Sequence, residues 1–236
     1  MLTNLALRAL SATSARRASR ACATTVSMAA PSLRLVYFNI RARAEPARLA
    51  LFIGGIPFED VRIAKEDWPG LKASQPFAQV PVLEVEGVPL AQSYAILLYC
   101  GRLAKLVPSE ALAAAQVEAL LFHFIDLDVL LAPSGKEGDK ERKKALRVAL
   151  AADGGPLRGW FAAIERVLAA NASGWLVGGE LTVADLALYG RVGSFLKGAY
   201  DDIPADIVDA FPRVNALHGR VLAHPKVVEW YAIEGK

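Results

Sequence analysis

Cysteine is scarce in this chain of 236 residues, which contains only Cys22 and Cys100. Two cysteines so far apart support neither a disulfide framework nor a zinc site. The three histidines also lack the spacing of metal ligands, so no metal is expected. The longest uncharged run, residues 87–101, is too short and too polar to cross a bilayer, which needs roughly 20 apolar residues. We therefore expect a protein that neither depends on a metal nor spans a membrane.

Acidic side chains are absent from the N-terminal region, where the first is Glu45. The chain has a formal net charge of +3, but residues 1–30 contain four arginines and no acid, so the remainder nets −1. Residues 1–27 have the Arg-, Ser- and Ala-rich composition of a transit peptide, which predicts a mitochondrial or plastid location. The other interpretation is that these residues form a disordered tail and that Met28 is an alternative start. The protein would then be cytoplasmic. The sequence has no basic patch with interleaved aromatic residues, so it gives no support for nucleic-acid binding.

The N-terminal half alternates strand and helix patterns. Residues 33–38 and 58–63 have the composition of strands, and a helical pattern over 44–53 lies between them. A short helix is expected within 68–74. Two further strands follow, joined by Glu86-Gly87 as an antiparallel hairpin, and then a helix that ends near Lys105. The order β-α-β-α-β-β-α predicts a thioredoxin-like α/β domain in which the first two strands are parallel.

The second half has no strand pattern. Helices are expected over 110–131, 139–151, 156–170, 182–195, 214–222 and 226–232, and Thr182-Val183-Ala184-Asp185 has the form of a capping box. Val107-Pro108-Ser109 interrupts the pattern between the halves. We therefore predict three parts: a leader over residues 1–30, a thioredoxin-like domain over 31–107, and an all-α helical bundle over 108–236.

The segment from Gln79 to Ser93 predicts a binding site. Pro81 stands at the start of a strand, where a proline loses no ladder hydrogen bond. Gln92-Ser93 precedes an apolar run, and the free N–H groups at the start of a helix attract anions. A peptide-like ligand with a carboxylate could pair with the backbone near Val80 and place its anion at Ser93.

A redox reaction requires a Cys-x-x-Cys at the end of the first strand, but the sequence there is Asn39-Ile40-Arg41-Ala42. Tyr37 is the alternative reactive group, because its hydroxyl can donate a hydrogen bond to a bound thiolate and favour the ionised form. Arg43 can add positive potential to the same sulfur. Taken alone, Tyr37 is more simply a strand-end residue that packs with its ring.

Several motifs in order resemble those of one family. The sequence from Tyr37 to Arg48, the sequence from Asp67 to Lys72, and Val80–Gly87 followed by Gln92-Ser93 are similar to cytosolic glutathione S-transferases. The sigma class, which includes glutathione-dependent prostaglandin D synthases, matches best. Leu181–Asp185, Phe211–Val214 and His224-Pro225 fit the C-terminal pattern of the family, so the resemblance covers about residues 33–231.

The resemblance implies a homodimeric enzyme that binds glutathione and conjugates it to a hydrophobic electrophile held by the helical half. Tyr37 would be the catalytic hydroxyl, with Arg43 beside it. The resemblance implies glutathione contacts at Tyr37, Arg43, Trp68, Lys72, Gln79, Val80, Pro81, Gln92 and Ser93, and at Glu118 from the partner subunit. Within this set, Trp68 and Lys72 would hold the glycine end, Val80 before a cis Pro81 the cysteinyl unit, and Gln92 and Ser93 the γ-glutamyl end.

Other interpretations of these residues stay open. Trp68 could be a buried anchor, Lys72 a surface lysine and Glu118 a solvated helix residue. Ala42 stands where many sigma members have glycine, which would strain a backbone with positive φ. A glutathione-dependent isomerase of the prostaglandin D synthase type, and a non-catalytic structural homologue, are the alternative functions.

Overall fold

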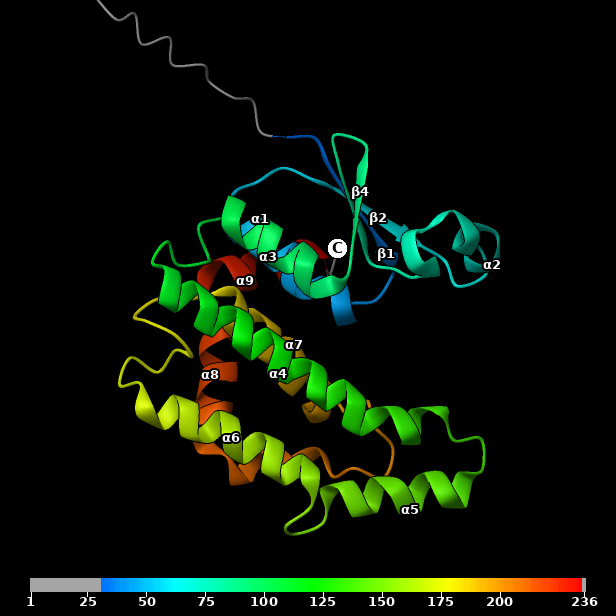
Figure 1. Ribbon diagram of the computed structural model, residues 1–236, viewed down its shortest axis with the longest axis vertical. Helices are drawn as coiled ribbons and strands as arrows, with labels where there is room; N and C mark the ends of the chain where they lie inside the picture. The colour runs from blue at the N-terminus through cyan, green and yellow to red at the C-terminus, as the bar shows by residue number, and fades with distance from the viewer. Residues whose placement is uncertain (1–30, 235–236) are drawn as a thin grey trace, which may run out of the picture.

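The computed structural model describes residues 31–234, in which a small sheet with its helices lies against a larger group of helices (Figure 1). The predicted leader lies outside the described residues. The sheet has the order β2-β1-β3-β4, formed by β1 (Leu33–Phe38), β2 (Glu59–Ile63), β3 (Val82–Val85) and β4 (Val88–Ala91). Strands β1 and β2 are parallel, whereas β1–β3 and β3–β4 are antiparallel. The predicted thioredoxin-like arrangement is confirmed.

Three α-helices lie in the first half of the described chain. They are α1 (Glu45–Ile53), which follows a 3-10 turn over Ala42–Ala44, the short α2 (Trp68–Leu71), and α3 (Ser93–Leu103). Pro46 lies in the first turn of α1, where its missing N–H breaks no helical hydrogen bond. The hairpin turn has positive φ at both Glu86 and Gly87, as expected for a two-residue connection between twisted strands.

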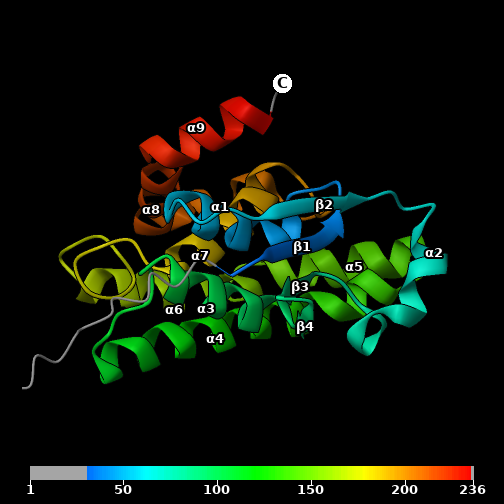
Figure 2. The ribbon, with the colours of Figure 1, turned by 90° about the horizontal axis from the view of Figure 1, so that it is seen from above.

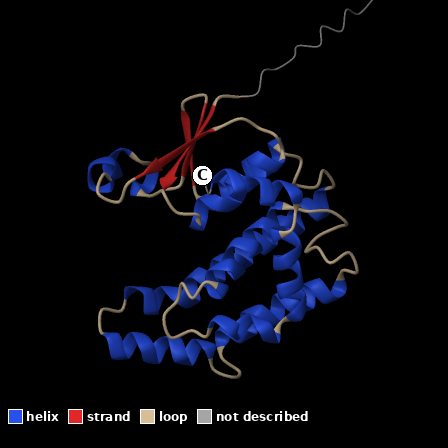
Figure 3. Cartoon of the chain, turned by 180° about the vertical axis from the view of Figure 1, so that it is seen from behind, coloured by secondary structure: helices blue, strands red, loops and turns tan. Residues whose placement is uncertain are grey.

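The second half is entirely helical in the described residues, as predicted (Figure 3). Its helices are α4 (Ala111–Lys136), α5 (Lys140–Ala151), α6 (Pro156–Ala170), α7 (Val183–Leu196), α8 (Pro212–Leu222) and α9 (Pro225–Glu234). A 3-10 segment over Ala205–Ala210 was not predicted. Helix α4 also extends past the expected end at residue 131 and includes Pro133. The amide that Pro133 lacks would have bonded to the carbonyl of Val129, a residue on the exposed surface, so water can serve that carbonyl.

One hydrophobic core joins the two halves, because α1 and α3 both contact the buried helix α7. The C-terminal helix α9 returns to α1 (Figure 2). Trp230 on α9 donates a hydrogen bond from Nε1 to Glu45 over 2.9 Å, and its ring lies 5.2 Å from that of Phe52. These contacts fix α1, and with it the loop between β1 and α1 that carries Arg43.

Within residues 31–234, none of the helices combines the length and the apolar character needed to cross a bilayer. The same residues contain no group of three or more His, Cys, Asp or Glu side chains arranged to hold a metal ion.

Candidate active site

Four segments that are far apart in the sequence meet around a cavity of about 500 Å³. It lies where strands β1 and β4 end and strand β3 begins. The four segments are the end of β1 with the loop after it, the α2 region, the segment before β3, and the junction of β4 with α3. The lining includes most of the residues that sequence reasoning selected, namely Arg43, Trp68, Lys72, Gln79, Val80, Pro81, Gln92 and Ser93. The fold therefore brings these predicted residues to one place.

The segment before β3 presents unpaired backbone to the cavity. The register of β3 with β1 and β4 begins at Val82, so Val80 lies outside the ladder. The Val80–Pro81 peptide bond is cis, as predicted. A peptide-like ligand can therefore extend the hydrogen-bonding pattern of the sheet at Val80.

The start of α3 forms one end of the cavity. Ser93 is the first residue of this helix, and Gln92 before it has φ 73° and ψ 113°. The first N–H groups of a helix have no intrahelical partner, and the helix dipole adds positive potential at the same place. This end of the cavity therefore suits a carboxylate.

The α2 region forms another wall of the cavity. Trp68 is half-buried, and its ring meets that of Phe38 edge to face at 5.6 Å. Lys72 is exposed, and among residues 31–234 it has no ion-pair partner. Trp68 is thus not the buried anchor considered from the sequence, and the Lys72 ammonium is available to a second carboxylate of the ligand.

Tyr37 lines a second, smaller cavity of about 190 Å³ that shares Arg43 and Ser93 with the first. Only 6% of Tyr37 is exposed. Burial raises the pKa of the Tyr37 hydroxyl, although its hydrogen bond with the Arg43 backbone and the guanidinium groups of Arg43 and Arg48 oppose this effect. The hydroxyl therefore stays protonated at neutral pH and can act as a hydrogen-bond donor.

The second cavity also contains a cluster of charged and aromatic groups that sequence reasoning missed. Asp128 on α4 accepts two hydrogen bonds from Arg191 on α7, and one of them, from Nη2, spans 2.7 Å. Asp128 also lies 3.2 Å from the Arg43 guanidinium. Arg191 in turn donates to the Tyr94 hydroxyl from Nη2 and Nε, over 3.0 and 3.3 Å. The available signal was Arg191 in the middle of the helix predicted over 182–195, where its neighbours are mainly apolar, because a charge in apolar surroundings requires a partner.

Comparison with known proteins identifies the two halves. Models of the glutathione S-transferase N-terminal domain and of the glutathione S-transferase C-terminal domain match residues 33–102 and 131–234. Glutathione S-transferase 1 of Ascaris suum is 35% identical over 209 residues, which cover 86% of this chain and 96% of the relative. The chain belongs to the glutathione S-transferase family.

Solved structures support the same assignment for this glutathione S-transferase. The structure described as prostaglandin synthase D of Nilaparvata lugens matches with a TM-score of 0.78 and 30% identity, over 86% of this chain and 98% of the other. A structure of Na-GST-3 from Necator americanus, described as monomeric, matches with a TM-score of 0.73 and 29% identity, over 86% and 97% of the two chains. The sigma class is compatible with these matches but is not decided by them.

Ala42 has the positive φ that was considered from the sequence and that strains an alanine. Its φ is 34°, a region that costs less for glycine than for alanine. Ala42 lines the second cavity next to Arg43. The strain therefore falls on the loop that positions the arginine of this transferase.

Glu118 lies outside both cavities. It is on α4, where it forms an ion pair of 2.8 Å with the exposed Arg102 on α3. Among residues 31–234 of one chain, Glu118 therefore forms no hydrogen bond or ion pair with another predicted site residue. Its predicted role requires a second subunit.

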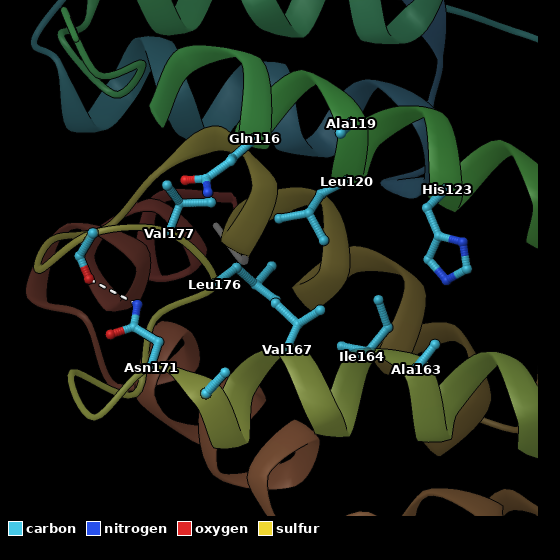
Figure 4. Close-up of a pocket in the computed structure, with 12 residues that line it drawn as sticks. Gln116, Ala119, Leu120, His123, Ala163, Ile164, Val167, Asn171, Leu176 and Val177 are labelled. Atoms are coloured by element: carbon cyan, nitrogen blue, oxygen red, sulfur yellow. Dashed lines mark hydrogen bonds between the residues drawn. The ribbon is translucent and has the colours of Figure 1, made fainter. Parts of the chain in front are cut away.

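A larger cavity, of about 690 Å³, lies between α4 and α6 and includes none of the predicted site residues. Figure 4 shows Leu120 and His123 of α4 facing Ile164 and Val167 of α6 across it. The wall is mainly apolar, and the His123 Nε2 atom is buried without a hydrogen-bond partner among the described residues. This cavity lacks the carboxylate-binding groups of the first one, so it is a poor candidate for the glutathione site.

Proposed function

We propose that this protein is a glutathione transferase that activates the thiol of glutathione and adds the sulfur to a small electrophile. The observation that carries the proposal is the position of Tyr37. A buried, protonated hydroxyl lines one cavity, while a neighbouring cavity that shares Arg43 and Ser93 presents groups suited to a peptide with two carboxylates. No step of this chemistry requires a metal.

The two carboxylates of glutathione would bind at opposite ends of the 500 Å³ cavity. The γ-glutamyl carboxylate is placed at the N–H groups of Ser93, with Gln92 beside it. The glycine carboxylate is placed near Lys72 and Trp68. The cysteinyl backbone then pairs with Val80, which directs the sulfur toward the cavity of Tyr37. Pro81 and Gln79 complete the wall on this side.

Tyr37 would stabilise the thiolate by donating a hydrogen bond to the sulfur. A hydrogen bond to a charged group is worth about 1.5–3 kcal/mol. Arg43 adds positive charge close to the same sulfur, although Asp128 offsets part of it. Holding the thiolate beside the electrophile in the second cavity replaces a bimolecular encounter by a step within one complex.

The proposal is tested with Tyr37→Phe and, as a matched control, Tyr99→Phe, since Tyr99 lies on α3 and lines neither cavity. With a model aryl halide, Tyr37→Phe is expected to lower kcat by about 10-fold or more, following the energy of the lost hydrogen bond. Glutathione affinity, measured by calorimetry, should change little in either variant. Unchanged turnover in Tyr37→Phe would remove the proposed role of Tyr37, and absence of glutathione binding to the wild type would contradict the function as a whole.

A second candidate is a glutathione-dependent isomerase, in which glutathione is regenerated. The similarity to a structure described as prostaglandin synthase D is the observation that favours it. Product analysis separates the two, because a transferase consumes one glutathione per turnover and an isomerase consumes none. A non-catalytic homologue would bind glutathione without forming either product.

We also propose that two copies of the chain assemble as a homodimer. Phe122, Ile125 and Val129 follow each other at helical spacing on α4 and form an apolar stripe, which we call the α4 stripe. Their exposed fractions are 67%, 40% and 65%. Glu118 lies four residues before Phe122 and so shares its face of the helix. A second copy that covered the α4 stripe would therefore face Glu118, where it could reach the γ-glutamyl amine of glutathione bound to that copy.

The proposed import of the protein into a mitochondrion or plastid rests on the composition of residues 1–27 alone. N-terminal sequencing of the native protein would test it. A mature chain that retains those residues would contradict the import.

A further inference from the structure

The last turn of α9 contacts the loop between β1 and α1, although the two segments lie far apart in the sequence. The Glu234 carboxylate accepts hydrogen bonds from Nε of Arg41 over 3.0 Å and from Nη2 of Arg62 over 2.6 Å. The Arg41 guanidinium also lies 3.9 Å from the centre of the Tyr231 ring on the same helix. Only 12% of the Glu234 side chain is exposed, so its ion pairs are screened less by water and salt than pairs on the open surface.

Arg62 extends this contact to the start of the same loop. It lies on β2, and its Nη1 atom donates a hydrogen bond to the Asn39 side chain over 3.2 Å. Its Nε atom donates to Asp60 over 2.8 Å, which holds the guanidinium in place. We call Asn39-Ile40-Arg41 the 39–41 segment. Glu234 therefore restrains both ends of the 39–41 segment, one end directly at Arg41 and the other through Arg62.

The residue that follows the 39–41 segment is strained. Ala42 has a φ of 34°, which costs more for alanine than for glycine, and such a conformation persists only where the surroundings hold it. The buried Arg48 donates to the Ile40 carbonyl over 2.8 Å and so anchors the middle of the segment. The Arg41 side chain, next to Ala42, is held by Glu234. Without Glu234, relaxation of Ala42 would displace the residue after it.

That next residue is Arg43, whose backbone amide acts on Tyr37. Burial raises the pKa of the Tyr37 hydroxyl, and its hydrogen bond with the Arg43 backbone is the largest effect that opposes this. A hydroxyl whose oxygen accepts a hydrogen bond is a stronger donor through its own hydrogen. The Arg43 amide therefore strengthens the hydrogen bond that Tyr37 is proposed to donate to sulfur. Arg43 also lines both cavities, so its displacement would move the guanidinium relative to the sulfur as well.

We propose that Glu234 is a positioning residue for thiol activation, which holds the 39–41 segment so that Arg43 stays beside Tyr37. This inference rests on the proposed transferase function and adds to it a residue from the C-terminal helix. Glu234 lines neither of the two cavities, so its effect passes through the two arginines that it binds. The C-terminal helix thereby contributes to the strength of the Tyr37 hydrogen bond without contacting the ligand.

The inference is tested with Glu234→Gln, which removes the charge but keeps the length of the side chain. Glu229→Gln is the matched control, because Glu229 lies on the same helix and pairs with the exposed Lys226 over 2.8 Å. The pKa of the bound glutathione thiol is read from thiolate absorbance at saturating glutathione. Glu234→Gln should raise this pKa by about 0.5 unit, because Tyr37 remains but loses part of its support, and Glu229→Gln should leave it unchanged.

Turnover should show the same effect with a definite pH dependence. Below both pKa values the thiolate fraction in Glu234→Gln falls about 3-fold, so kcat with a model aryl halide at about pH 6 should fall about 3-fold. At about pH 9 the bound thiol is largely ionised in both proteins, so most of the difference should disappear. A role in stability alone would not produce this dependence on pH.

A second pair of variants tests the strain at Ala42. Glycine adopts a φ near 34° without strain, so in Ala42→Gly the 39–41 segment should keep its conformation without the charge of Glu234. The bound-thiol pKa of the double variant Ala42→Gly/Glu234→Gln should therefore differ from that of Ala42→Gly by less than about 0.2 unit. The charge of Glu234 thus matters only where the backbone is strained.

An unchanged bound-thiol pKa in Glu234→Gln, even with a lower melting temperature, would overturn the inference. An equal shift in Glu229→Gln, or an undiminished shift in the Ala42→Gly background, would overturn it too. Each of these results leaves the proposed function standing, provided that the wild type binds glutathione and lowers the pKa of its thiol. A wild type that does neither would contradict the proposed function, and the inference with it.

Discussion

Cys100 lies on α3 and is completely buried, and this burial determines the reactivity of its thiol. Burial raises the pKa of the Cys100 thiol to about 12, whereas a free thiol ionises near ~8.5. The thiolate is the reactive form, so Cys100 should be inert in the native protein. This agrees with its interpretation as a small core residue and separates it from the thiol that the protein is proposed to activate.

The reactivity of Cys100 can be measured with a chromogenic disulfide reagent in a Cys22→Ser variant, which leaves one thiol. At pH 8 the native variant should react very slowly and the unfolded variant at once. The raised pKa of the Cys100 thiol also makes the free energy of unfolding depend on pH. Stability from the buried neutral thiol is present below the unfolded pKa and is lost as the pH rises from there toward the folded value. Rapid labelling of the native protein at pH 8 would contradict the burial.

At the level of single residues, the sequence predicted the lining of the 500 Å³ cavity better than that of the smaller cavity beside Tyr37. Residues such as Trp68, Val80 and Ser93 lie in short segments whose local patterns are characteristic, and the fold brings them together. Asp128 and Arg191 are different. They are 63 residues apart and become partners only because α4 packs against α7, which no local pattern specifies. The Tyr94 hydroxyl meets Arg191 because α3 packs against α7, which no local pattern specifies either.

At the level of elements, the capping box before α7 links that helix to the preceding loop. Asp185 is fully buried and accepts hydrogen bonds from the backbone N–H of Thr182 over 2.8 Å and of Leu176 over 2.9 Å. The Thr182 hydroxyl donates to the same carboxylate over 2.8 Å. Helix α7 carries Arg191, so this cap also supports the cluster around Tyr94.

We expect Asp185→Ala to lower the free energy of unfolding by about 2–4 kcal/mol, because it removes a cap and leaves buried donors without an acceptor. Asp185→Asn keeps one acceptor oxygen and should cost less. Urea unfolding followed by circular dichroism measures both. A loss below about 1 kcal/mol in Asp185→Ala would show that the loop and α7 do not depend on this carboxylate.

The types of most elements could be predicted, since strands and helices have distinct periodicities. The exceptions have local causes. Helix α4 continues through Pro133, and the residue whose carbonyl loses its helical partner, Val129, lies on the surface, so the local rule that proline ends a helix did not hold here. The 3-10 segment over Ala205–Ala210 is short and has no periodic pattern to detect.

At the level of the whole molecule, the α4 stripe should determine assembly. Wild-type protein is expected to sediment as a dimer, and Phe122→Glu as a monomer, because a charge would be buried in the contact. Val228→Glu is the control, since Val228 is 55% exposed on α9, outside the α4 stripe. A monomeric wild type, or a dimeric Phe122→Glu variant, would contradict the proposed homodimer.

Tyr37 is proposed to lower the pKa of the thiol of bound glutathione, at the place where the two cavities meet. Ultraviolet absorbance of the thiolate, recorded against pH with glutathione bound, measures this pKa directly. A hydrogen bond worth about 1.5–3 kcal/mol corresponds to about 1–2 pKa units. The wild type should therefore give a pKa at least about 1 unit below the free value of ~8.5, and Tyr37→Phe should restore most of the difference. An equal pKa in both proteins, or a bound thiol that titrates like free glutathione, would contradict the proposed role of Tyr37.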